Sequence, residues 1–139
     1  MHKKLKVDVL RIDYQAFDES IWDLRVGGLK VQAGDNCLTT EDHRDLAGQT
    51  VEIALGLEFV QLEANPSEAQ GLTLENRPAS RRCGSDIAVS GRLSERIGDE
   101  LYLLDGPWPI YLHLEDQHEW HIGDYVQARG LLCVMLEES

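Results

Sequence analysis

The stretch from Ile87 to Leu132 decides the fold, and it reads IAVSGRL (87–93), ELYLLDGPWPIYLHL (100–114) and IGDYVQARGLL (122–132). An apolar residue occupies every second position in each segment, which is the period of a strand with one buried face. Gly91 and Gly130 lie inside strands, where glycine is typical of a bulge or a tight barrel bend. The three segments therefore predict a strand, a hairpin and a further strand of a small β barrel.

Three short patterns occur in this stretch, namely Val89-x-Gly91-Arg92-Leu93, Leu103-Leu104-Asp105-Gly106 with Ile110, and Gly123-Asp124-x-Val126-x-x-x-Gly130. In these patterns, residues 86–132 resemble the nucleic-acid-binding OB (oligonucleotide/oligosaccharide-binding) family, in the version of anticodon-binding and single-strand-binding domains. The resemblance covers about a third of the chain. The chain departs from the family because residues 115–122 leave no room for the usual helix, and Ser139 comes before a fifth strand can form.

The missing strand is expected from the first half of the chain, where Thr50–Leu62 alternates most regularly and puts Phe59 on its apolar face. We therefore predict a mainly β fold: an OB-like small barrel with additional N-terminal strands and one or two short helices. The whole chain, 1–139, is expected to form a single domain. In it, residues 1–83 contribute strands to an OB-like half, residues 84–139.

Other elements of the first half follow from local signals. Strands are expected at Leu5–Ile12, with a bulge near Val9, and at Ile21–Val31. The Gly27-Gly28 pair indicates a tight hairpin turn or a bend. Short helices are expected at Glu41–Ala47 and from Asn65 to Gly71, where capping and stop residues frame each segment. We find no internal repeat in the sequence.

Charge limits the possible partners, because 25 acidic against 13 basic residues give a net charge of −12. Residues 84–139 contain 11 acidic residues and only three basic ones, Arg92, Arg96 and Arg129. Nucleic-acid binding draws most of its affinity from cationic side chains that displace counterions from phosphates. The acidic balance therefore favours a basic protein partner over a nucleic acid.

Several other classes of protein are not expected. No apolar run approaches the roughly 20 residues that cross a bilayer, and the N-terminus does not resemble a secretory signal, so we expect a cytoplasmic protein. Cys37, Cys83 and Cys133 are far apart and favour reduced thiols. We expect no enzymatic activity and no cofactor, because the chain contains no nucleophile elbow, P-loop or Rossmann fingerprint.

A histidine-rich segment, HLEDQHEWH, could in principle hold a divalent ion. Its residues His113, His118 and His121 do not follow a zinc-binding spacing, so we interpret the segment as a solvated hairpin tip and predict no metal site. The only basic loop cluster is Arg77, Arg81 and Arg82, which we interpret as solvated.

Five of the nine aromatic residues lie in the last forty positions. We predict that four of them face outward and bind the protein partner, inside an acidic rim; these residues are Tyr102, Trp108, Tyr111 and Tyr125, with Asp105, Glu115 and Asp124. Removing Tyr111 is then expected to weaken binding and to leave stability nearly unchanged. The other interpretation is that residues 1–80 cover these aromatics.

An immunity or inhibitor protein for a basic toxin is one concrete form of this prediction. The alternative function is an OB-fold protein that binds single-stranded nucleic acid, with the tyrosines stacking on bases and Arg92, Arg96 and Arg129 on phosphates.

Overall fold

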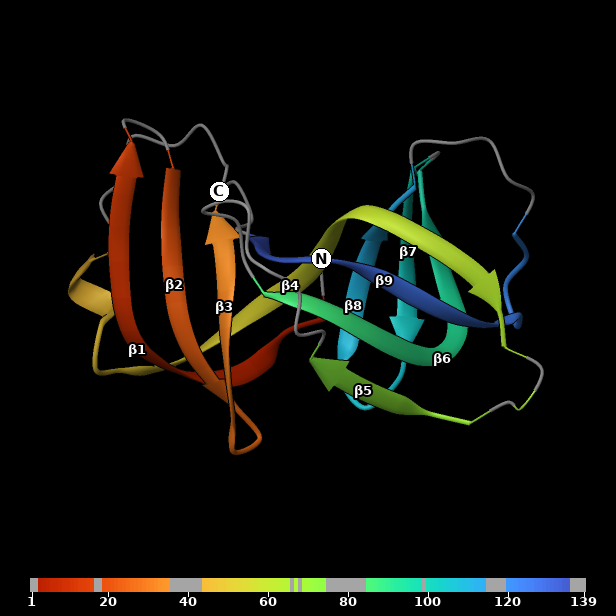
Figure 1. Ribbon diagram of the computed structural model, residues 1–139, viewed down its shortest axis with the longest axis horizontal. Helices are drawn as coiled ribbons and strands as arrows, with labels where there is room; N and C mark the ends of the chain where they lie inside the picture. The colour runs from red at the N-terminus through yellow and green to blue at the C-terminus, as the bar shows by residue number, and fades with distance from the viewer. Residues whose placement is uncertain are drawn as a thin grey trace.

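The computed structural model describes residues 3–16, 19–35, 44–65, 67, 69–74, 85–98, 100–114 and 120–135 (Figure 1). The mainly β prediction is confirmed. The strands are β1 (Leu5–Ala16), β2 (Glu19–Val26), β3 (Leu29–Asp35), β4 (Thr50–Ala64), β5 (Gly71–Leu74), β6 (Asp86–Ile97), β7 (Leu101–Asp105), β8 (Pro109–His113) and β9 (Tyr125–Met135).

The strands close into two rings that share β4 and β9. In the first ring, the antiparallel strands β1, β2 and β3 form a meander, β3 pairs with β9 in parallel, and β4 closes the ring by pairing with β1. In the second ring, β6, β7 and β8 form the meander, β8 pairs with β4 in parallel, and β9 pairs with β6. Figure 1 shows β4 and β9 running between the two meanders. The expected pairing of Thr50–Leu62 with the 86–134 region is confirmed.

The two rings repeat one pairing scheme. In each, the first strand of the meander is antiparallel to one of the two shared strands, β1 to β4 and β6 to β9. The third strand runs parallel to the other shared strand, β3 to β9 and β8 to β4. The sequence shows no such repeat because strand pairing requires only a matching alternation of apolar residues, which many unrelated sequences satisfy.

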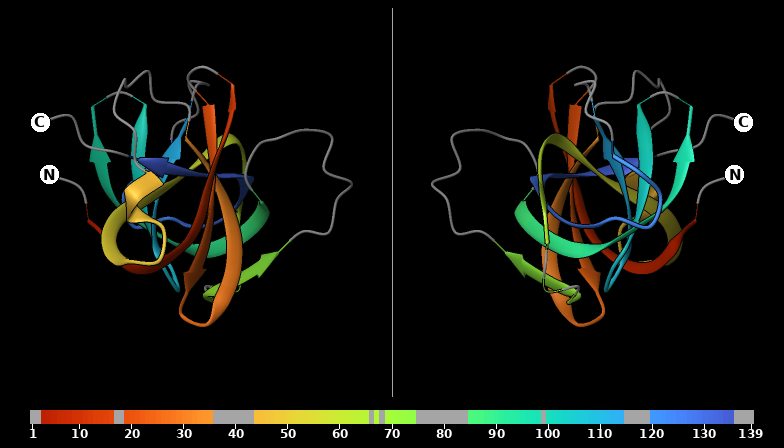
Figure 2. Two further views of the ribbon diagram at one scale, coloured as in Figure 1. Left: turned by 90° about the vertical axis from the view of Figure 1, so that its left-hand side faces the viewer. Right: turned by 90° about the vertical axis from the view of Figure 1, so that its right-hand side faces the viewer.

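One apolar core fills both rings. It contains the inward side chains of both meanders together with those of β4 and β9, among them Trp22, Leu55, Leu104 and Leu132. The views in Figure 2 show that the strands of each meander curve around this interior. Because β4 and β9 contribute to the core of both rings, the two meanders are packed against a common pair of strands.

Two local predictions for the first half, a turn and a bulge, are confirmed. Gly27 (φ 57°) and Gly28 (φ 85°) form the two-residue turn between β2 and β3, and this left-handed backbone is the one that tight hairpins require. The slip in alternation near Val9 corresponds to a register shift between Val9 and Arg11 in β1.

The helix predictions are only partly tested. Of the predicted helix at Glu41–Ala47, residues 41–43 lie outside the described part, and Arg44–Leu46 forms a single 3-10 turn. In the described part of the 65–71 segment there is a turn at Ser67 and no helix. Gly71, which we interpreted as a helix stop, instead begins the short strand β5, which pairs with β6. Within the described ranges, no helix has the length and apolar character needed to cross a bilayer.

Gly91 allows β6 to pass close to the turn between β7 and β8. A Cβ atom at Gly91 would lie 2.5 Å from the carbonyl oxygen of Asp105 and 2.9 Å from the Cα of Gly106. Both contacts are with backbone atoms, which cannot move aside as a flexible side chain can.

We therefore expect Gly91→Ala to lower the free energy of unfolding by about 1–3 kcal/mol, because the added methyl group overpacks this contact. Gly71→Ala is the matched control, since nothing lies within 4 Å of its Cβ position. Urea denaturation of the two variants measures the difference. Equal stabilities would contradict the close approach.

Candidate functional site

The structure does not form the predicted patch of outward aromatic side chains. Tyr102 is 5% exposed and belongs to the main core, on the same face of the β7–β8 hairpin as Leu104 and Leu112. The outward position predicted for Tyr102 is therefore wrong. The run Leu101-Tyr102-Leu103-Leu104 is apolar on both faces, so alternation alone does not show which face points to the core.

Tyr111 lies on the opposite face from the main core, as predicted, but this face is covered. Its side chain is 1% exposed and packs with Ala54 and Leu103, next to Leu101 and Met135. The backbone N–H of Lys3 donates a hydrogen bond to the Tyr111 hydroxyl at 2.6 Å. The prediction that Tyr111 is exposed is therefore wrong, and covering residues do come from the first half of the chain.

The burial of Tyr111 reverses the expected effect of removing it. We expect Tyr111→Ala to lower the free energy of unfolding by about 3–5 kcal/mol, the usual cost of truncating a buried aromatic ring. The control is Tyr111→Phe, which keeps the ring and should lose only about 1 kcal/mol for the hydrogen bond. Thermal melting distinguishes them, and an unchanged melting temperature for Tyr111→Ala would show that the ring is exposed.

The other members of the predicted patch do not form one exposed cluster. Trp108 and Tyr125 are half-buried, and Trp108 packs against the main core. Asp105 is exposed, and Asp124 accepts a hydrogen bond from the backbone N–H of His121 at 2.9 Å. Glu115 lies outside the described residues.

The three arginines of the alternative nucleic-acid site lie next to tyrosine or acidic residues of this chain. Arg92 is directly opposite Tyr125 on one side and Asp105 on the other. The guanidinium carbon of Arg96 lies 5.6 Å from the centre of the Tyr102 ring. Arg129 lies 4.0 Å from the Glu63 carboxylate. Because Tyr102 is buried and Tyr111 is covered, neither ring is free to stack on a base.

The histidine segment is only partly described. His113 and His121 are exposed, and residues 115–119, which include His118, lie outside the described part. In the part of the chain that is described, no three histidine, cysteine or acidic residues come close enough to hold a metal ion. Of the three cysteines, only Cys133 is described, and its side chain is buried. The loop arginines at 77, 81 and 82 also lie outside the described part.

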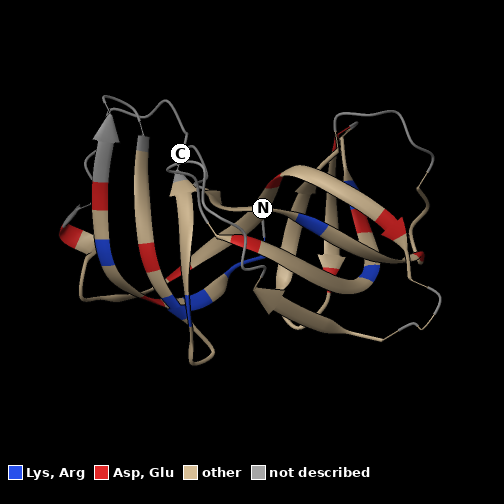
Figure 3. Ribbon diagram, viewed as in Figure 1, with Lys and Arg blue, Asp and Glu red and all other residues tan. Residues whose placement is uncertain are grey.

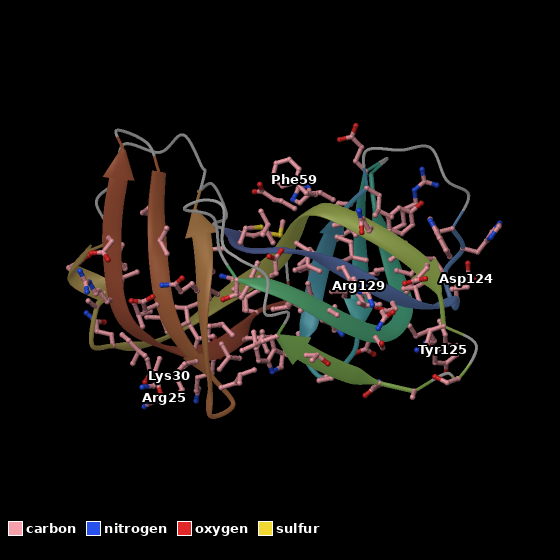
Figure 4. The ribbon with its side chains drawn as sticks, in the orientation of Figure 1. Arg25, Lys30, Phe59, Asp124, Tyr125 and Arg129 are labelled. Atoms are coloured by element: carbon pink, nitrogen blue, oxygen red, sulfur yellow. The ribbon has the colours of Figure 1, made fainter. Side chains whose placement is uncertain are left out.

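Sequence reasoning also placed Phe59 wrongly. Its side chain is 75% exposed, the highest value among the large apolar side chains of the described residues, and it projects from β4 (Figure 4). Phe59 also has a φ of 56°, a left-handed conformation that no other non-glycine residue adopts in the described ranges. The predicted position of Phe59 on the buried face of its strand is wrong.

A bulge in β4 explains both properties of Phe59. The pairing of β4 with β9 shifts register between Glu58↔Leu131 and Gln61↔Arg129, so that Phe59 and Val60 lie opposite the single residue Gly130. In a bulge of the G1 type, the first residue takes the left-handed conformation and is usually glycine. Gly130 makes room for the bulge, because a Cβ atom there would lie 2.7 Å from the Glu58 carbonyl oxygen.

The sequence does contain a signal for this bulge. Up to Leu57, the large apolar residues of the strand occupy odd positions, whereas Val60 and Leu62 occupy even ones. Both of the latter pack against the main core, so one residue between Leu57 and Val60 must be extra.

The outer face around Phe59 is polar and mainly acidic. Residues directly opposite one another on neighbouring strands share a face, and the pairing of β4, β9 and β6 gives the rows Glu58–Leu131–Asp86 and Gln61–Arg129–Ala88, with Glu63 following Gln61. We call these residues, together with Phe59, the Phe59 face. It contains an exposed aromatic ring, three carboxylates and one arginine that lies beside Glu63.

Comparisons of the chain with models of protein families, with curated proteins and with solved structures find no match. What the site does must therefore be argued from its own residues.

Proposed function

We propose that this protein is a non-enzymatic β-barrel module that binds a basic protein partner, and that Phe59 is the aromatic anchor of the interface. The observation that carries this proposal is an exposed phenylalanine in a left-handed backbone conformation. The acidic aromatic patch predicted from the sequence is thereby replaced by the Phe59 face, which has the same chemistry but different residues.

Among the described residues, Phe59 itself gains little burial that would offset the cost of its conformation. A left-handed conformation costs a residue with a Cβ atom roughly 1–2 kcal/mol, and glycine would adopt it without that cost. An aromatic ring that is 75% exposed recovers little of this by burial. Strained residues of this kind cluster at functional sites, and exposed aromatic rings are frequent hot spots of protein interfaces.

The charge around Phe59 supports a basic partner. Glu58, Glu63 and Asp86 belong to the Phe59 face, and the whole chain has a net charge of −12. The negative field of these carboxylates accelerates the encounter with a cationic protein. The Phe59 ring, once it is buried in the interface, supplies most of the affinity. An immunity or inhibitor protein for a basic toxin or nuclease is the concrete form that we favour.

The pairing order of the second ring supports an OB-like barrel in which β4 takes the place of the missing fifth strand. This order is also what favours the alternative function, binding of single-stranded nucleic acid. Against it stand the covered face of the β7–β8 hairpin, where OB barrels hold their ligands, and the contacts of Arg96 and Arg129 with the protein itself.

The decisive variant is Phe59→Gly. We expect it to raise the free energy of unfolding by about 1 kcal/mol, because glycine relieves the left-handed strain, and yet to abolish binding of the partner. The measurements are urea denaturation and affinity capture from the native host with the tagged full-length chain, followed by identification of the retained proteins.

The matched control is Ile122→Ala, which removes another exposed apolar side chain outside the Phe59 face. A basic protein retained by the wild type and by the control, but not by Phe59→Gly, supports the proposal. Retention by all three chains would contradict it. Tight, salt-sensitive binding of a labelled single-stranded oligonucleotide would instead favour the alternative function, since we expect no better than millimolar affinity at physiological salt.

A further inference from the structure

The short strand β5 is an open edge of the sheet. Among the described residues, every other strand pairs with at least two neighbours, because both rings are closed, whereas β5 pairs with β6 alone. Figure 1 shows β5 at the border of the sheet, beyond β6. The outward backbone groups of such an edge strand form a template to which another strand can add.

The pairing of β6 with β9 identifies which backbone groups of β5 point outward. The backbone N–H of Leu132 donates a hydrogen bond to the carbonyl of Ser85 at 2.9 Å, in the register of the β6–β9 ladder. Hydrogen-bonded residues alternate along such a ladder, so the odd-numbered residues of β6 bond to β9 and the even-numbered ones face β5. Ala88↔Thr73 is therefore a hydrogen-bonded pair of β6 and β5.

Leu72 and Leu74, on either side of Thr73, consequently turn their backbone N–H and C=O groups to the open edge. Their side chains lie opposite Val89 and Ile87, which are fully buried, so both leucines belong to the inner, apolar face of the sheet. Leu72 packs against the main core, whereas Leu74 is 39% exposed. The apolar face thus continues to the open edge and ends there with a partly exposed leucine.

Little in β5 prevents pairing between two edges. Native sheets protect their edges with charged side chains, proline or bulges. The sequence of β5, Gly-Leu-Thr-Leu, contains no charge and no proline, and its pairing with β6 has no register shift. Figure 3 shows β5 without an acidic or basic residue, although the chain has a net charge of −12. Repulsion between two copies is therefore weak along this edge, because charges more than about 8 Å away are largely screened at physiological salt.

We propose that β5 is the interface of a homodimer, in which the β5 strands of two copies pair antiparallel about a two-fold axis at Thr73. This register puts Leu72 opposite Leu74 of the second copy, so that outward backbone groups meet outward backbone groups and each such pair exchanges both hydrogen bonds. On the inner face, the two leucines extend one apolar row from copy to copy. On the outer face, Thr73 meets Thr73 of the second copy, which is a favourable cross-strand pair.

A second copy fits this edge better than a strand of the basic partner proposed above. A cationic strand would find no carboxylate on β5 and would place its charge beside Leu72 and Leu74. A second copy brings an uncharged strand whose register is complementary to its own, as a two-fold contact requires. Because β5 has only four residues, the interface is small, and we expect a weak dimer that forms between micromolar and millimolar concentration. No residue of the Phe59 face lies on β5, so the inference is independent of the proposed function.

The test is sedimentation equilibrium of the full-length chain over this range of concentration. We expect the wild type to shift from monomer to dimer as the concentration rises. Leu74→Lys should raise the dissociation constant of the dimer by about tenfold or more, because it buries an ammonium group beside Leu72 of the second copy. In the monomer the same side chain can extend into solvent from the sheet edge.

Ile97→Lys is the matched control. Ile97 is the last residue of β6, beyond the part that pairs with β5, and its exposure of 37% is close to that of Leu74. The control makes the same change in charge and should dimerise as the wild type does. Thermal melting of both variants checks that they fold.

Amide hydrogen exchange of the wild type, followed residue by residue by NMR, tests the register itself. At low concentration the amides of Leu72 and Leu74 should exchange quickly, and that of Thr73, which is bonded to β6, more slowly. At high concentration the exchange of Leu72 and Leu74 should become slow, because the second copy then accepts hydrogen bonds from them. This readout decides alone if Leu74→Lys lowers the melting temperature.

Three results would overturn the proposal. A wild type that stays monomeric up to millimolar concentration would show that the edge of β5 does not pair with itself. Equal weakening of the dimer by Leu74→Lys and Ile97→Lys would show a general charge effect. A dimer in which the exchange of Leu72 and Leu74 stays fast would assign the contact to another surface.

Discussion

The antiparallel pairing of β4 with β9 is the constraint on which the rest of the structure depends. It runs from Ala54↔Met135 to Ala64↔Val126, and each strand also gives a parallel partner to the meander of the other half. Two glycines in this pair have close neighbours. A Cβ atom at Gly56 would lie 2.7 Å from the sulfur of Met135, and one at Gly130 would meet the Glu58 carbonyl oxygen. Without the pair, each meander would keep an open edge that exposes unpaired backbone groups.

The same pair generates the most unusual residue of the surface. Two residues of β4, Phe59 and Val60, lie opposite the single residue Gly130 of β9. One of the two must therefore bulge outward, and that residue is Phe59. We expect a glycine at this position to make the pairing more stable. The exposed aromatic ring adds little to the fold, and we therefore propose that it serves a partner. The site that we propose thus places strain on an interaction that holds both rings together. This arrangement is the usual compromise between stability and function.

Strand positions and turns could be predicted because they follow from local patterns. The strand at Thr50–Leu62, apart from its bulge at Phe59, the slip at Val9 and the Gly27-Gly28 turn have the expected structure. The exposure of a side chain could not be predicted in this way, because it depends on whether a distant part of the chain covers that side chain. Tyr111 is buried by Ala54, Met135 and Lys3, none of which is near it in sequence.

Native-state hydrogen exchange tests the shared pair most directly, because it measures which segments open together. If both rings depend on β4 and β9, the amides of these two strands should exchange slowest, and the β1–β3 and β6–β8 meanders should lose protection in the same cooperative opening. The account would be contradicted if the β6–β8 meander kept its protection after β4 and β1–β3 had exchanged.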